Sequence, residues 1–330
     1  MIVFSGPSDI LECYNSPYVR FATLHELARE ELKNTVETEE FVNSSYKNEI
    51  IEYISNKTLN FKVINIETKT RCNFTCNFCP VNLNVDPRPI GEMDWKIIYK
   101  IADELSDINY SKTINLFGNN EPLLDNRITK IIDIFRKACP NSKIKLLTNG
   151  ILLNKKLCHD LFESGLSKIR INNYGNKLIS SCKEILSSAQ EFRNNDIVIS
   201  VRLRSEILTT RAGNAPNKHT AEIRSSGFCG LPFVDLTIDY LGRAVLCCFD
   251  AYSEHFIADI SRVTLREAWM SSTLRGIRDT LSAEGRQALP VCSKCDFDGF
   301  RDFEQNPSHP RRRPHSNDMS QRPQQFSTWK

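Results

Sequence analysis

The sequence predicts an α/β protein: a partial, five- to six-stranded TIM-like barrel followed by a small C-terminal module. Three observations predict this fold. Strand-like and helix-like segments alternate five times between Lys62 and Arg204, which is typical of parallel strands joined by right-handed crossovers. A hairpin pattern replaces this alternation in the last third of the chain. Most of the 12 cysteines fall into two groups, one in each of these parts.

The N-terminal segment, 1–60, is polar with apolar residues at helical spacing, so we expect a helical extension there. The barrel domain is expected over 61–215. Its strands are expected at 62–70, 113–117, 143–148, 167–172 and 196–204, and its helices at 94–105, 126–138, 154–164 and 178–193. Active sites of such folds lie at the carboxyl ends of the strands, which here hold the first cysteine group and several polar residues.

The C-terminal module is expected over 216–303. Two strands, 233–239 and 243–247, flank a turn that ends at Gly242, and a single helix is expected over 265–281. The tail, 304–330, is rich in Pro, Arg, Ser and Gln, and its composition indicates disorder.

The net charge of +3 is confined to this tail, which carries five basic and two acidic residues. The rest of the chain is neutral and shows no nucleic-acid footprint. No stretch approaches the ~18 apolar residues of a membrane helix. The first residues lack the pattern of a signal peptide. We therefore expect a cytoplasmic protein with neither a nucleic-acid nor a membrane partner.

The first cysteine group has a compact spacing, Cys72-x3-Cys76-x2-Cys79. Three thiolates can hold one face of a cubane iron–sulfur cluster and leave one iron without a protein ligand. A zinc site with a distant fourth ligand is the alternative. Cys139, Cys158 and Cys182 lie in or beside helical patterns, and we expect them to be ordinary buried residues.

This spacing, placed just after a first strand, resembles that of the radical S-adenosylmethionine (SAM) enzymes. The resemblance implies a [4Fe–4S] cluster that binds SAM and an electron donor of the flavodoxin or ferredoxin type. Phe78 matches the position near the adenine. Gly118, Asn120, Glu121 and Pro122 match the motif around the SAM amino group, although Asn119-Asn120 replaces the usual second glycine. Asn149, Asn173 and Arg204 lie at later strand ends and are further candidates for cofactor binding.

The second cysteine group resembles the auxiliary-cluster domains called SPASM and twitch. The resemblance implies a second [4Fe–4S] cluster held by Cys229, Cys247, Cys292 and Cys295. The number of cysteines is that of the shorter twitch form, and the spacing is similar to that of deoxy-scyllo-inosamine dehydrogenases; aminoglycoside epimerases are related. A zinc knuckle built from the same four cysteines is the alternative.

The resemblance implies a deoxyadenosyl radical that removes hydrogen from a hydroxyl-bearing small molecule, a sugar or cyclitol. Oxidation and epimerisation are both open outcomes. Arg211 would then orient the substrate, since a guanidinium is a poor base, and Cys248 could return hydrogen in an epimerase. Modification of a ribosomal peptide and a non-catalytic zinc protein are the remaining hypotheses.

Overall fold

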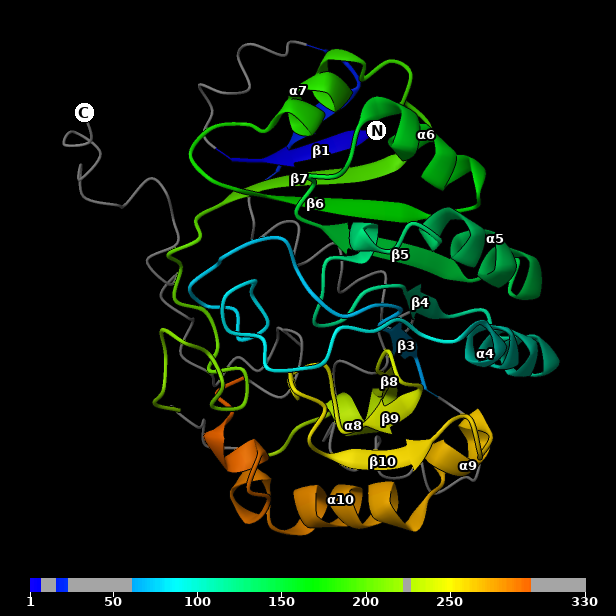
Figure 1. Ribbon diagram of the computed structural model, residues 1–330, viewed down its shortest axis with the longest axis vertical. Helices are drawn as coiled ribbons and strands as arrows, with labels where there is room; N and C mark the ends of the chain where they lie inside the picture. Colours follow the sequence, from blue (N-terminus) through cyan, green and yellow to red (C-terminus); the bar gives the residue numbers. More distant parts are fainter. Residues whose placement is uncertain (7–15, 23–60, 222–226, 298–330) are drawn as a thin grey trace, which may run out of the picture.

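The computed structural model describes residues 1–6, 16–22, 61–221 and 227–297. One 10-stranded sheet runs through them in the order β10-β9-β8-β3-β4-β5-β6-β7-β1-β2 (Figure 1). The strands are β1 (Ile2–Ser5), β2 (Val19–Phe21), β3 (Val63–Ile66), β4 (Thr113–Asn115), β5 (Lys143–Thr148), β6 (Lys168–Tyr174), β7 (Asp196–Arg202), β8 (Asp235–Ile238), β9 (Arg243–Val245) and β10 (Phe256–Asp259). Pairing is parallel from β8 through to β2, and antiparallel among β8, β9 and β10.

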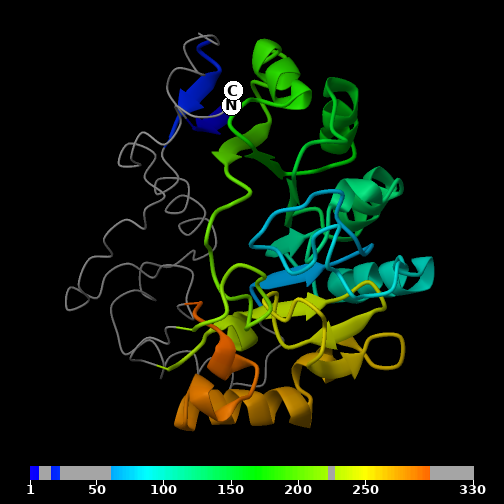
Figure 2. The same cartoon turned by 60° about the vertical axis from the view of Figure 1, so that its left-hand side comes forward.

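Helices follow the central strands in turn and lie along one side of the sheet (Figures 1 and 2). The helices are α4 (Trp95–Asp107), α5 (Ile128–Ala138), α6 (Lys155–Glu163), α7 (Ser180–Ser187), α8 (Leu231–Val234), α9 (Leu265–Trp269) and α10 (Ser272–Ala283). The alternation that the sequence predicts between Lys62 and Arg204 is confirmed. No helix within the described ranges has the length and apolar character needed to cross a bilayer.

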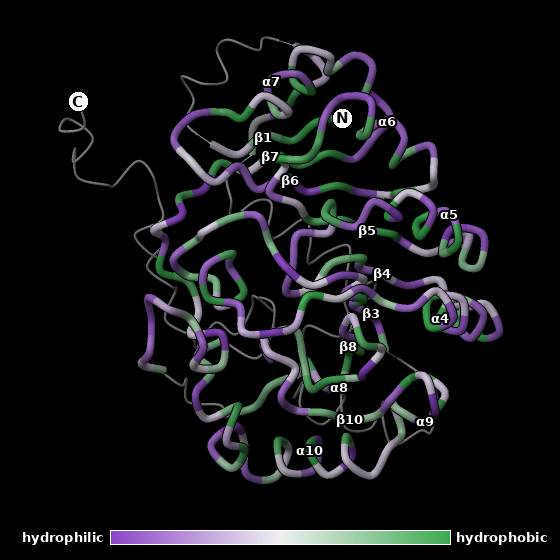
Figure 3. Tube along the Cα trace, in the orientation of Figure 1, coloured by the Kyte–Doolittle hydropathy of each residue, from purple (hydrophilic) through white to green (hydrophobic). Residues whose placement is uncertain are grey.

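Sequence periodicity explains how these helices pack. The apolar residues of α5 recur at helical spacing, and Ile128, Ile131, Ile132 and Phe135 are buried against the sheet. In Figure 3 both the helices and the central strands alternate between apolar and polar residues, as expected for elements with one buried face. Asp94 caps α4 by accepting a hydrogen bond from the Lys96 N–H, at 2.7 Å, as expected for an N-cap aspartate.

The expectation of a helical extension over 1–60 is wrong for its described parts. β1 and β2 are strands, and β1 pairs in parallel with β7, with Phe4 opposite Ile199. Together with β8, they raise the parallel strands above the five to six expected. Residues 7–15 and 23–60 lie outside the described residues, as does the tail after 297. A four-residue apolar strand at a chain start is too short for periodicity to identify.

The C-terminal module is not a separate sheet. The hairpin of β8 and β9 forms as expected around Gly242, whose φ of 77° favours glycine. β8 also pairs in parallel with β3, so the module continues the barrel sheet. The prediction of a single helix over 265–281 is wrong. The segment forms two helices, because the Ser271 hydroxyl accepts from the Leu274 N–H and caps α10 anew.

Replacing Phe4 by Ala tests the structural role of β1. Phe4 is fully buried in the main core, so its truncation should lower the free energy of unfolding by about 3–5 kcal/mol. Ile90, which is 75% exposed, is the control, and Ile90→Ala should change it by less than about 0.5 kcal/mol. Urea unfolding measures both. Equal effects would contradict the placement of β1 inside the sheet.

Candidate active site and cluster-binding residues

The first cysteine group lies in the loop between β3 and α4. This light-blue loop lies between the barrel strands and the C-terminal module in both views (Figures 1 and 2). The side-chain amide of Asn82 folds the loop, because it donates to the carbonyls of Cys76 at 3.1 Å and Cys79 at 2.8 Å. Cys72, Cys76 and Cys79 share one apolar cluster, which also contains the rings of Phe74 and Phe78.

Burial of Cys72 and Cys76 disfavours their thiolate forms, so these thiolates need a neighbouring cation to be stable. Burial, together with the neighbouring Glu121 and Cys79, raises the pKa of Cys72 to about 12. Burial likewise raises the pKa of Cys76 to about 12, with Cys79 and Cys72 adding to the effect. Thiolates in such a place are stable when they bind a metal, which deprotonates them. The donor set of three soft sulfurs therefore fits an iron–sulfur cluster.

Glu121 lies beside this group, at the start of the short 3-10 helix Pro122–Leu124. Its carboxylate accepts from the Thr148 hydroxyl at 2.6 Å and from the Asn149 N–H at 2.7 Å. Burial raises the pKa of Glu121, and these hydrogen bonds oppose the rise. The Asn149 amide in turn reaches Cys72 Sγ at 3.8 Å. The structure thus brings three predicted site residues together: Cys72, Glu121 and Asn149.

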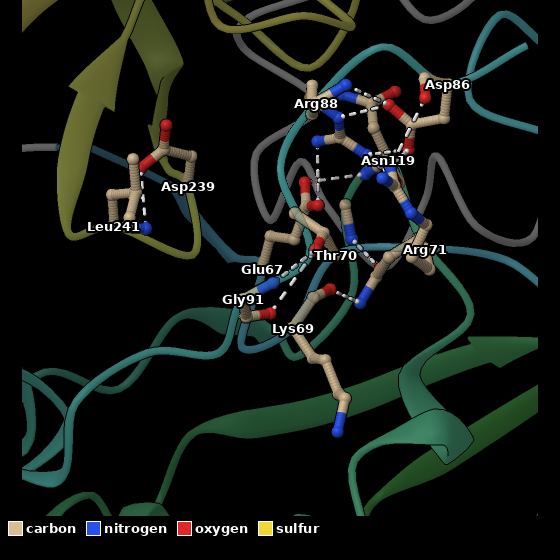
Figure 4. Close-up of polar contacts among 12 residues, drawn as sticks. Glu67, Lys69, Thr70, Arg71, Asp86, Arg88, Gly91, Asn119, Asp239 and Leu241 are labelled. Carbon is tan, nitrogen blue, oxygen red and sulfur yellow. Dashed lines mark hydrogen bonds and ion pairs between the residues drawn. The ribbon is translucent and has the colours of Figure 1, made fainter.

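A buried ion-pair network that the sequence analysis missed joins the same loop to β3 (Figure 4). The Arg88 guanidinium binds Glu67 at 2.8 Å and Asp86 at 3.0 Å, and it donates to the Asn119 carbonyl. Glu67 also accepts from the Asn119 N–H at 3.0 Å. A side chain at Gly118 would lie 2.9 Å from Glu67, so the motif backbone approaches this closely only with glycine there.

The candidate SAM-motif residue Asn120 closes its own turn. Its side chain accepts from the Gly118 N–H at 3.0 Å and donates to the Lys69 carbonyl at 2.7 Å. The side chain of Asn119 instead bonds to two residues far along the chain. Its amide donates to the Cys248 carbonyl at 3.3 Å and accepts from Arg211 Nη2 at 3.2 Å. The sequence gives no periodic signal for this contact, because its partners are about 90 and 130 residues away.

Arg211 and its neighbours hold an unusual backbone. Arg211, Ala212 and Gly213 all have positive φ, at 50°, 56° and 89°, a conformation that costs free energy at non-glycine residues. The loop is tied to the second cysteine group, because the Thr210 hydroxyl donates to the Lys294 carbonyl at 2.6 Å. The Arg211 guanidinium also lies 5.5 Å from the ring centre of Phe249. Both candidate residues of the substrate site, Arg211 and Cys248, are hydrogen-bonded to the side chain of Asn119.

Of the later strand ends, β6 differs from expectation. Asn173 is fully buried and binds its own loop, donating to the Lys177 carbonyl at 3.0 Å and accepting from the Ile179 N–H at 2.8 Å. Its neighbour Tyr174 points the other way, as alternation along a strand requires, and packs 5.7 Å from the ring of Phe78. Arg204 does reach the cysteine loop, with its guanidinium 4.4 Å from the ring centre of Phe74.

The second cysteine group forms at the junction of β9, the 3-10 turn Cys292–Lys294 and the segment before α8. Two adjoining apolar clusters contain these thiols: one holds Cys229, Cys247 and Cys292, and the other holds Cys247, Cys292 and Cys295. Burial, together with the charges of Cys292 and Cys295, raises the pKa of Cys229 to about 12. Four neighbouring thiols, one buried and three half-buried, fit a fully ligated iron–sulfur cluster.

Comparison with known families agrees with this geometry. Residues 66–172 match the model of the radical SAM superfamily, and residues 229–296 match that of SPASM, an iron–sulfur cluster-binding domain. The chain contains a radical SAM domain and a SPASM domain. The resemblance predicted from the cysteine spacing is confirmed. So are the cofactors that it implied, since radical SAM domains bind a [4Fe–4S] cluster and SAM and SPASM domains bind auxiliary clusters.

The chain is also similar to individual proteins. A SAM-dependent 2-deoxy-scyllo-inosamine dehydrogenase of Niallia circulans is 22% identical over 239 residues, 72% of this chain and 93% of the relative. A GTP 3',8-cyclase of Clostridium acetobutylicum is 27% identical over 113 residues, 34% of this chain and 35% of the relative. The crystal structure of BtrN in complex with AdoMet and 2-DOIA covers 74% of this chain and 96% of its own, at 21% identity and a TM-score of 0.65, which confirms the fold.

Replacing Arg88 by Met tests the buried network of the radical SAM domain. The change leaves Glu67 buried without its cation, so the free energy of unfolding should fall by about 3–5 kcal/mol. Adding Glu67→Gln should recover part of this loss, because it removes the unpaired charge. Lys137→Met, in an exposed pair with Asp133, should cost less than about 1 kcal/mol. Urea unfolding of these proteins and of Glu67→Gln alone, five proteins with the wild type, measures these differences. A double variant whose loss equals the sum of the two single losses would contradict the coupling.

Proposed function

We propose that the protein is a radical SAM oxidoreductase that dehydrogenates a carbinol carbon of a sugar or cyclitol. One observation carries the proposal: the loop of Arg211 packs against both groups of thiols, because Leu208 lies in the apolar cluster of Cys72, Cys76 and Cys79, and Ala212 lies in that of Cys247, Cys292 and Cys295. Such an arrangement suits a reaction in which one centre starts a radical and another takes up an electron. The similarity to a cyclitol-amine dehydrogenase over 72% of the chain favours a small molecule over a ribosomal peptide.

Oxidation of an alcohol to a ketone removes one hydrogen atom from carbon, one proton from the hydroxyl group and one electron. When bound, SAM and its cluster would supply the radical that takes the hydrogen atom, and the auxiliary cluster would accept the electron. Cys72, Cys76 and Cys79 would hold the first cluster. Cys229, Cys247, Cys292 and Cys295 would hold the auxiliary one. We infer a flavodoxin or ferredoxin type of donor and a cytoplasmic location, where such clusters persist.

Several side chains would bind and orient the small molecules. Phe78 lies within the cysteine loop, and the side chain of Asn149 reaches Cys72. Glu121 would offer its carboxylate to the SAM ammonium group. Arg211 would orient the substrate hydroxyl as a fixed hydrogen-bond donor, because its guanidinium stays charged and cannot accept the proton. The Asn119 contact and the bound loop of Thr210 hold Arg211 in place.

Epimerisation is the second candidate, and Cys248 is the observation that favours it. Cys248 adjoins the auxiliary ligand Cys247, is partly exposed, and has its carbonyl bound to Asn119. A thiol there could return a hydrogen atom to the substrate. The product would then be the inverted alcohol, with no net oxidation.

Iron content tests the two cluster sites. Anaerobically reconstituted protein should contain about eight irons per chain, the sum of two cubanes. Cys72→Ala should lower this to about four and abolish reductive cleavage of SAM, whereas Cys229→Ala should leave SAM cleavage measurable. The buried Cys182, outside both groups, gives the control Cys182→Ser with unchanged iron. Stoichiometric zinc in place of iron would contradict the proposal.

Deuterated water separates the two reactions. With 2-deoxy-scyllo-inosamine as the probe, we expect a ketone and about one 5'-deoxyadenosine per product. Mass spectrometry should find no deuterium retained at the reacting carbon, because dehydrogenation returns no hydrogen to it. An inverted alcohol that carries carbon-bound deuterium, and that Cys248→Ala no longer forms, would contradict dehydrogenation and establish epimerisation.

A further inference from the structure

The buried Arg286 lies beneath the second cysteine group. It begins the 3-10 turn Arg286–Ala288 and is only 1% exposed. The backbone directs it inward, because its N–H donates to the Gly227 carbonyl at 2.6 Å and the preceding Gly285 has a φ of 81°. A side chain at Gly285 would lie 3.2 Å from that same carbonyl. The close packing of Gly227 against Gly285 therefore holds the backbone of Arg286 in place.

The Arg286 guanidinium is only partly satisfied by the protein. Nη1 donates to the carbonyls of Cys295, at 3.4 Å, and Phe297. Nε and Nη2 are buried and have no hydrogen-bond partner among the described residues. Nor does any carboxylate of that part of the chain form an ion pair with Arg286. Asp296, which follows Cys295, is bound instead to Lys218 and to the Thr210 N–H.

Arg286 is bonded to the segments that carry the thiols. Its N–H donates to the Gly227 carbonyl, two residues before Cys229, and its Nη1 donates to the Cys295 carbonyl. Its own carbonyl accepts from the Leu289 N–H at 3.1 Å, and the Leu289 carbonyl accepts from the Ser293 N–H at 2.8 Å, next to Cys292. The positive charge of Arg286 is thus placed beside the segments that would hold the cluster.

Burying a cation without an anion is costly even after the protein relaxes around it. A [4Fe–4S] cluster with four thiolates carries a net negative charge in both of its common states, and this charge rises on reduction. We infer that Arg286 is the buried counter-ion of the auxiliary cluster and raises its reduction potential, with Nε and Nη2 as the available donors. This inference rests on the proposed auxiliary site.

The counter-ion has a direct consequence for the electron. Uptake of one electron makes the cluster more negative, and a fixed positive charge stabilises this reduced state more than the oxidised state. The charge therefore favours electron uptake by the cluster. Arg278, on α10, is the natural contrast. It is also buried, and its Nη2 likewise has no hydrogen-bond partner among the described residues. Its guanidinium lies 4.0 Å from the ring centre of Trp269 and donates to the Trp269 and Pro232 carbonyls, so it is a second buried arginine whose charge faces an aromatic ring.

The test uses a full-length parent that carries Cys72→Ala, Cys76→Ala and Cys79→Ala, so that the auxiliary cluster is the only one formed. The parent is compared with versions that add Arg286→Gln, Arg286→Lys or Arg278→Gln. A redox titration followed by electron paramagnetic resonance gives each midpoint potential. We expect a negative shift in Arg286→Gln, and a smaller shift or none in Arg286→Lys and Arg278→Gln. A parental potential in Arg286→Gln, or an equal shift in Arg278→Gln, would overturn the inference.

Iron content decides the case if a variant does not keep its cluster. Loss of iron in Arg286→Gln with retention in Arg278→Gln supports the counter-ion, since the anionic cluster then needs that particular charge. The same loss in both glutamine variants overturns it. A parent without any iron would overturn the auxiliary site itself, whereas an iron-loaded parent with unchanged potentials would overturn only the role of Arg286.

Discussion

The pairing of β3 on both of its edges is the constraint on which the structure depends. One edge pairs with β4, the next barrel strand, and the other pairs with β8, which begins the C-terminal module. The cysteine loop leaves the carboxyl end of β3, so the same backbone that positions the first thiols also anchors the second group. Because β3–β8 pairing joins residues about 170 apart, it brings two distant parts of the chain, each with one thiol group, onto the same sheet.

Local patterns predicted much of this fold. The strand over 143–148 and the Asp94 cap are found where the sequence places them, because alternation and capping depend on near neighbours. Long-range pairing has no such signature. The short β1 and the pairing of β8 with β3 therefore have no local signal, and the sequence predicts the C-terminal module without its continuation of the barrel sheet. Fold errors thus occur where sheet partners are distant in the chain.

The candidate site shows the same division. Cys72, Cys76 and Cys79 could be found because chelation by one loop demands a fixed spacing. Arg88 and Asn119 could not, since their partners come from three different segments and charged residues in loops are common. Asn173 illustrates a finer limit: a strand end can be located to within one residue, but that residue decides which side of the sheet the side chain faces.

Arg88 and Arg286 are both buried near the thiols, and their different hydrogen-bond and ion-pair partners indicate different roles. Arg88 meets Glu67 and Asp86, so its charge is compensated within the protein and its role is to fix the cysteine loop against β3. Arg286 is equally buried, and among the described residues it meets only carbonyls, through one of its three nitrogens. Because burial of a cation is costly in either place, we assign the compensation for Arg286 to an anionic metal cluster held by the four neighbouring thiols.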